Sequence, residues 1–178
     1  MALKRPERIP RQKPEYDQKV LDMRRVARVM AGGRRFSFRV TVVIGNRKGK
    51  VGMGTAKGQD MTLAVEKAVR QAKKRMITVP LRQGTIPHEV FAKFKSGKVF
   101  LKPTKPGSGV IAGGAVRVVC DFAGITHIVG KIMGKSSNQI NNAIATLTAL
   151  GQLKRTPASR GAPVPQPAQQ EPEVPQKK

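Results

Sequence analysis

The sequence predicts an α+β protein: an N-terminal three-stranded antiparallel sheet with one helix, then a C-terminal β-α-β-α two-layer sandwich. Three observations support this fold class. Apolar and polar residues alternate along 35–44, as in a half-buried strand. Apolar residues recur at helical spacing along 61–76. Short strand-like and helix-like segments then alternate from 90 to 153, after a break that contains proline and glycine.

The predicted strand 35–44 has two different faces because successive side chains point to opposite sides. One face carries Phe36, Phe38, Val40, Val42 and Ile44, and the other carries Arg35, Ser37, Arg39 and Thr41. We expect the first face to pack in the core and the second to stay wet and cationic. The glycine-bounded turn 45–49 leads into a second strand, 50–56, and the mixed apolar and cationic segment 19–30 fits an edge strand.

A helix is predicted over 61–76, with Asp60 as its side-chain cap. Its apolar stripe consists of Met61, Val65, Ala68, Val69, Ala72 and Met76. We expect this stripe to cover the apolar face of the hairpin.

The C-terminal part begins after the Pro- and Gly-containing segment 81–87. Strands are predicted at 90–94, 98–103 and 128–133, and helices at 115 to about 123 and 140–153, with a glycine-rich loop at 107–114. The expected domain plan is a flexible basic arm (1–18), the sheet-and-helix domain (19–80), a linker (81–87), the sandwich (88–155) and a disordered tail rich in Pro, Ala and Gln (156–178).

The net charge of +25 on 178 residues indicates a polyanionic partner, either nucleic acid or an anionic membrane surface. The stretch 23–59 contains many Arg and Lys residues and no acid, so we expect no local partner to neutralise them. No apolar stretch approaches the roughly 20 residues that a membrane span needs. With six Phe, one Tyr and no Trp, recognition of the phosphate backbone is favoured over base stacking.

Catalytic and metal-binding chemistry is not expected. The loop 107–114 before a helix could capture an anion, but 81–155 holds only Glu89 and Asp121 as carboxylates. His88 and His127 stand apart, without ligands at metal-binding spacing. The lone Cys120 excludes an intramolecular disulfide and fits a reducing compartment. We therefore predict no catalytic residue, metal, cofactor, small-molecule substrate or membrane contact.

Four stretches resemble the bacterial family of small-subunit ribosomal protein number five: 31–38 (AGGRRFSF), 52–54 (GMG), 79–88 (VPLRQGTIPH) and 107–117 (GSGVIAGGAVR). The likeness covers roughly residues 17–153. It implies an N-terminal domain similar to a double-stranded RNA-binding domain and a C-terminal sandwich of a kind also seen in some small-molecule kinases. It also implies a cytoplasmic, ribosome-bound protein that contacts small-subunit ribosomal RNA and ribosomal proteins numbered four and eight.

The resemblance further implies a place near the messenger RNA entry channel, an influence on decoding accuracy and a loop at 31–34 near the spectinomycin site. The residues predicted to bind RNA are Arg24, Arg25, Arg28, Gly32, Gly33, Arg34, Arg35, Arg39, Arg47, Lys48, Lys50 and Lys57. Those predicted to contact other proteins are Gly107, Ser108, Gly109, Gly113, Gly114 and Arg117. The alternatives are a free-standing double-stranded RNA or nucleoid-binding protein, and a relic of a small-molecule kinase that uses the loop 107–114.

Overall fold

The computed structural model describes residues 15–154. The predicted tail at 156–178 lies outside them, as does the predicted basic arm apart from residues 15–18. The N-terminal part contains one antiparallel sheet and one helix. Its elements are β1 (Asp17–Met30), β2 (Gly33–Gly45), β3 (Lys50–Gly58), α1 (Met61–Lys74) and β4 (Ile77–Thr78).

The sheet order is β1-β2-β3-β4, so the three predicted strands gain a fourth. This short strand pairs only with Lys50 and Val51 of β3. The rest of that edge of β3 therefore has no strand partner within the described residues.

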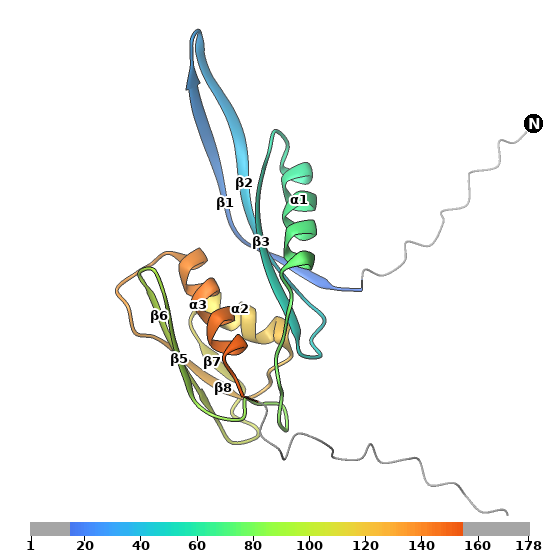
Figure 1. Cartoon of the computed structure of the whole chain (residues 1–178), viewed down its shortest axis with the longest axis vertical. Helices are drawn as coiled ribbons and strands as arrows, with labels where there is room; N and C mark the ends of the chain where they lie inside the picture. The colour runs from blue at the N-terminus through green and yellow to red at the C-terminus, as the bar shows by residue number, and fades with distance from the viewer. Residues whose placement is uncertain (1–14, 155–178) are drawn as a thin grey trace, which may run out of the picture.

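One face of β2 packs against α1 as predicted (Figure 1). The shared core consists of Val40, Val42, Ile44, Ala56, Ala64, Ala68 and Ala72. Two details of the predicted helix are wrong. Met61 is 48% exposed and Ala64 is buried in its place, because the buried stripe of α1 is a row of alanines that lets helix and strands approach closely. The Asp60 side chain forms no capping hydrogen bond.

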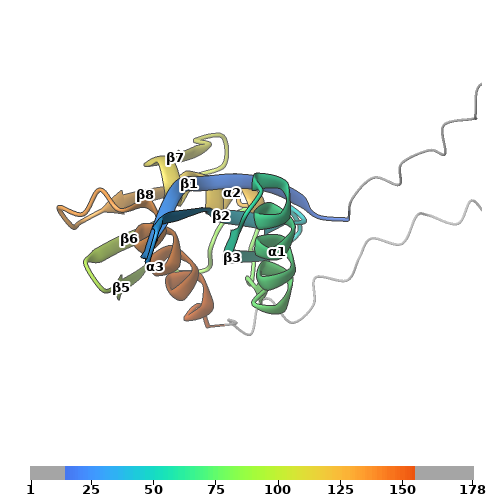
Figure 2. The ribbon, with the colours of Figure 1, turned by 90° about the horizontal axis from the view of Figure 1, so that it is seen from above.

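The opposite face of β2 is not wet along its whole length, contrary to the prediction. Thr41 and Val43 are buried, and the hydroxyl oxygens of Thr41 and Thr55 lie 3.0 Å apart. Val43, Val51 and Met53 belong to the hydrophobic core of the C-terminal part. The first sheet thus lies between α1 on one side and the C-terminal domain on the other (Figure 2).

The C-terminal domain is a four-stranded sheet with two helices. Its elements are β5 (Val90–Phe94), β6 (Gly97–Pro103), β7 (Val110–Ala112), α2 (Gly114–Ala123), β8 (Ile128–Ile132) and α3 (Gln139–Gly151). The strand order is β5-β6-β8-β7, with β7 parallel to β8 and the other pairs antiparallel. The predicted loop 107–114 therefore contains a strand that the sequence analysis missed. The α+β class with two sheet-and-helix domains is confirmed.

The two domains are joined through the turn between β2 and β3. The Arg47 amide donates to the Phe122 carbonyl at 3.1 Å, and the Gly49 amide donates to the Ala123 carbonyl at 2.8 Å. A Cβ atom on Gly124 would collide with the Arg47 carbonyl. The turn is thus docked on the C-terminal end of α2 by main-chain contacts. None of the helices within 15–154 is long and apolar enough to cross a membrane.

Candidate nucleic-acid interface

The most exposed part of the sheet is the outer half of the β1–β2 hairpin, which projects beyond α1 (Figure 1). Pairing of β2 with β3 ends at Phe38 and Gly58, so residues 26–37 form a two-stranded ribbon, here called the hairpin arm. Gly32 and Gly33 turn the chain at the tip with φ of 86° and 143°, a region that favours glycine. No atom lies within 4 Å of a Cβ placed on either glycine. The arm thus presents an open tip to a partner.

Cations lie directly opposite one another on one face of this hairpin. Arg28 pairs with Arg35 on the arm, and at its base Arg24 pairs with Arg39, which pairs in turn with Lys57 of β3. We call Arg24, Arg39 and Lys57 the basal row. Like charges opposite each other across strands are destabilising, and a bound anion would relieve the repulsion. This arrangement suits a polyanionic ligand.

Asp22, an acid just outside the acid-free stretch 23–59, partners two of these arginines. Its Oδ2 atom lies 3.2 Å from Arg24 Nε and 3.8 Å from Arg39 Nη2. The expectation that no local acid partners these arginines is therefore wrong for Arg24 and Arg39. A register shift between Val20 and Asp22 brings this carboxylate opposite Thr41, on the face of the basal row. Arg28 and Arg35 form no ion pair within residues 15–154.

The other face of the arm contains an exposed aromatic ring. The Arg25 guanidinium lies 3.8 Å from the centroid of the Phe36 ring, a cation–π contact. Phe36 is 48% exposed, so the prediction that it packs in the core is wrong. The reason is that α1 covers β2 only from its middle onward. Arg34 is exposed on the same face.

The remaining predicted cations lie at the opposite end of the sheet. Arg47, Lys48 and Lys50 sit in or beside the β2–β3 turn, and β2 spans 13 residues, roughly 40 Å at about 3.3 Å per residue. Arg47 Nε pairs with Asp17 Oδ2 at 2.9 Å, so the expectation that no local acid partners these cations is wrong for Arg47 as well. The Asn46 side-chain oxygen accepts hydrogen bonds from the Lys48 and Lys50 amides at 2.8 and 3.0 Å. The predicted RNA-binding set is therefore divided between two distant places.

The predicted protein-contact residues lie around β7 and the start of α2. Gly107 and Gly109 adopt left-handed φ of 93° and 69°, and a Cβ on either would meet nothing within 4 Å. Gly113 caps α2, Gly114 is its first residue, and Arg117 is exposed one turn later. Ser108 is exposed beside them. The Gly107 amide donates to His127 Nδ1 at 3.3 Å, so this histidine helps to hold the loop.

Cys120 lies in the core, not in a reactive site. Burial, and secondarily the charge of Asp121, raises the pKa of its thiol to about 12. The side chain therefore stays protonated at neutral pH and is a poor nucleophile. Within residues 15–154, no group of three or more His, Cys, Asp or Glu residues could hold a metal ion.

Two family descriptions match the chain. Ribosomal protein S5, N-terminal domain, matches residues 16–80, and Ribosomal protein S5, C-terminal domain, matches residues 92–159. The small ribosomal subunit protein uS5 of Thermus thermophilus is 48% identical over 140 residues, which is 79% of this chain and 86% of that protein. The proteins of the same name from Thermotoga neapolitana and Persephonella marina are 45% and 46% identical, over 78% of this chain and 78% and 71% of their own lengths.

These matches cover both domains in the order in which they occur along the chain. They agree with the resemblance of the glycine-containing stretches 31–38 and 107–117. The chain belongs to the ribosomal protein S5 family.

Proposed function

We propose that this protein is a structural constituent of the small ribosomal subunit and binds small-subunit ribosomal RNA through the hairpin arm and the basal row. The observation that carries the proposal is the set of directly opposed cations, Arg28 with Arg35 and Arg24 with Arg39 and Lys57. Such rows are unfavourable in isolation and favourable along a phosphate backbone. The family is structural and non-enzymatic, so the protein is not an enzyme.

The proposal extends to the division of labour along the chain. Residues 19–80 form the RNA-binding domain, 81–87 the linker and 88–155 the domain that contacts ribosomal proteins numbered four and eight. The contact surface of the C-terminal domain consists of Gly107, Ser108, Gly109, Gly113, Gly114 and Arg117. The exposure of five of these residues, all but Gly109, supports this assignment. The protein resides in cytoplasmic ribosomes near the messenger RNA entry channel and supports decoding accuracy.

Sedimentation of a cell lysate through a sucrose gradient tests this function. We expect the protein to co-migrate stoichiometrically with the small subunit and to remain bound after a wash at moderate salt. The competing reading is a free-standing double-stranded RNA or nucleoid-binding protein, which would remain mostly at the top of the gradient or sediment with DNA. Either result would overturn the proposal.

A further inference from the structure

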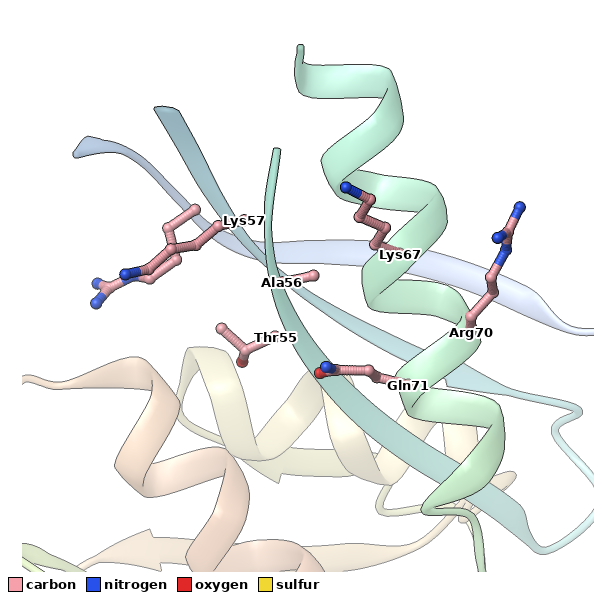
Figure 3. Close-up of a pocket in the computed structure, with 7 residues that line it drawn as sticks. Thr55, Ala56, Lys57, Lys67, Arg70 and Gln71 are labelled. Carbon is pink, nitrogen blue, oxygen red and sulfur yellow. The ribbon is translucent and has the colours of Figure 1, made fainter. Parts of the chain in front are cut away.

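A second cationic feature adjoins the basal row at the unpaired edge of β3 and shares Arg39 and Lys57 with it. Here a groove of about 420 Å³ is lined by Arg39, Thr55, Ala56, Lys57, Lys67, Arg70 and Gln71. Figure 3 shows Lys67 and Gln71 reaching from α1 toward β3, with Thr55 and Lys57 on the far side of the strand. We call this the β3-edge groove. The α1 cations Lys67 and Arg70 are absent from the predicted RNA-binding set.

The charge of the groove is unbalanced. Four of its seven lining residues are cations and none is a carboxylate. Two acids lie beside the groove and form long ion pairs with its lining: Asp22 Oδ2 is 3.8 Å from Arg39 Nη2, and Glu66 Oε2 is 3.9 Å from Arg70 Nη2. Lys57 and Lys67 form no ion pair within residues 15–154. Arg39 Nε is buried without a hydrogen-bond acceptor within residues 15–154, while 33% of the Arg39 side chain remains exposed.

The groove also has the size and polar groups that a sugar-phosphate backbone needs. At about 30 Å³ per molecule of liquid water, the groove volume of about 420 Å³ corresponds to more than ten water molecules. This leaves room for a phosphodiester group with its sugar. Lys67 and Lys57 offer ammonium groups, while Gln71 and Thr55 offer uncharged donors and acceptors from the two sides. The lining is too cationic to favour an apolar ligand.

The position of the groove favours a continuous RNA strand over a free nucleotide as its ligand. The basal row crosses the sheet from Arg24 through Arg39 to Lys57, the last residue before the unpaired edge of β3. Immediately across that edge stands Lys67 of α1. A backbone that follows the basal row therefore meets the groove without leaving cationic surface.

We infer that the β3-edge groove binds the phosphodiester backbone of RNA as a continuation of the basal row, with Lys67 as its central cation. This rests on the proposed function, because the RNA is the one that the arm and the basal row bind. It adds α1 to the interface. The domain thereby holds the RNA on the sheet and on the helix at once.

The first test measures binding of the full-length chain to small-subunit ribosomal RNA by filter assay at four salt concentrations. Lys67→Gln should lower the magnitude of the slope of log affinity against log salt by about 0.9, which is the change expected when one phosphate contact is lost. Lys73→Gln is the matched control, because it removes the same charge from the same helix outside the groove, where Lys73 lies 5.7 Å from the Tyr16 ring. Its slope should equal that of the unmodified protein.

The second test places a carboxylate in the groove. Gln71→Glu should weaken RNA binding about fivefold. The new carboxylate would repel a phosphate, and the repulsion between two like charges about 4 Å apart changes a binding constant by about that factor even in water. Gln152→Glu adds the same charge beyond the end of α3 and should change affinity less than twofold. Thermal melts of all four variants establish that each is folded.

The outcomes separate the groove from the general function. Equal slopes for Lys67→Gln and Lys73→Gln, in a protein that still binds the RNA, would overturn the groove alone and favour an acidic protein segment as its occupant. If the unmodified chain fails to bind the RNA, the proposed function and the groove both fall.

Discussion

Gly54 shows how closely the strands and helix of the first domain approach each other. A Cβ atom there would collide with the Ala68 carbonyl oxygen and lie 2.6 Å from the Ala72 amide nitrogen. Gly54→Ala should therefore destabilise the protein by about 1–3 kcal/mol or more, because backbone cannot move aside as a side chain can. Gly151→Ala, in α3 with nothing within 4 Å, should instead gain up to about 1 kcal/mol. Urea unfolding of both variants checks this, and equal midpoints would contradict it.

Cys120 gives a prediction about pH. Its pKa is raised from 9.0 to about 12, mainly by burial, so the folded state keeps the thiol proton where the unfolded chain releases it. This contribution to stability is complete below about pH 8.5 and declines as pH rises toward 12, by at most about 1.4 kcal/mol per pH unit. Cys120→Ala should flatten the fall in urea midpoint between pH 9 and 11. An equally steep fall in the variant would refute the assignment.

At the scale of single residues, the sequence predicted the right kinds of side chain but not their partners. It identified Arg24 and Arg39 correctly as strand cations, yet Asp22 escaped notice because it lies one position outside the acid-free stretch. A register shift then brings that carboxylate to both arginines. Lys67 is absent from the predicted RNA-binding set, because only the folded chain brings it to the edge of β3.

The hairpin arm is the element on which the RNA-binding proposal depends most. The double change Arg28→Gln plus Arg35→Gln should reduce the salt slope of RNA binding by roughly two, since both arginines lack an ion-pair partner in 15–154. Stability should change by less than about 0.5 kcal/mol, since both side chains are exposed. Filter binding at four salt concentrations and thermal melts provide the measurements.

The matched control for the arm is Lys93→Gln plus Lys98→Gln. These two exposed lysines also lie opposite each other, on β5 and β6 of the C-terminal sheet. Their removal subtracts the same charge but should leave the slope unchanged. If both double variants lower the slope equally, only net charge matters and the arm has no special role.

The two helix starts at Asp60 and Asn138 should respond differently to alanine. The Asn138 side-chain oxygen accepts a hydrogen bond from the Ile140 amide at 3.0 Å, whereas Asp60 forms no such bond at α1. Asn138→Ala should cost about 1 kcal/mol of unfolding free energy, and Asp60→Ala less than about half of that. Denaturant unfolding measures both, and the opposite order would show that charge outweighs the hydrogen bond.

At the scale of elements, periodicity predicted most of the fold. It missed β7 because a three-residue strand among glycines has no alternation to detect, and β7 exists through its parallel pairing with β8. The strand β4 was missed because two residues are too few to show a periodic pattern. The burial of Val43 could not be foreseen from β2 alone, because the C-terminal domain provides the covering surface.

For the whole molecule we predict one cooperative unfolding transition, because a single hydrophobic core joins Val43, Val51 and Met53 to α2 and α3. Gly124→Ala should lower the melting temperature and separate the domains into two transitions, since its Cβ would displace the Arg47 carbonyl from the docked turn. Gly107→Ala is the control: its φ of 93° carries comparable backbone strain without any collision. Scanning calorimetry distinguishes them, and a single unshifted transition in Gly124→Ala would rule out coupling through the turn.

The shared core also has a consequence for synthesis. The C-terminal end of α2 at Ala123 follows β3, which ends at Gly58, by 65 residues. At about 5–20 residues per second, β3 leaves the exit tunnel roughly 3–13 s before the end of that helix. During this interval α1 can cover one face of the nascent sheet, while Val43, Val51 and Met53 remain exposed to solvent on the other face. The growing chain therefore passes through a half-covered intermediate that only translation of the second domain completes.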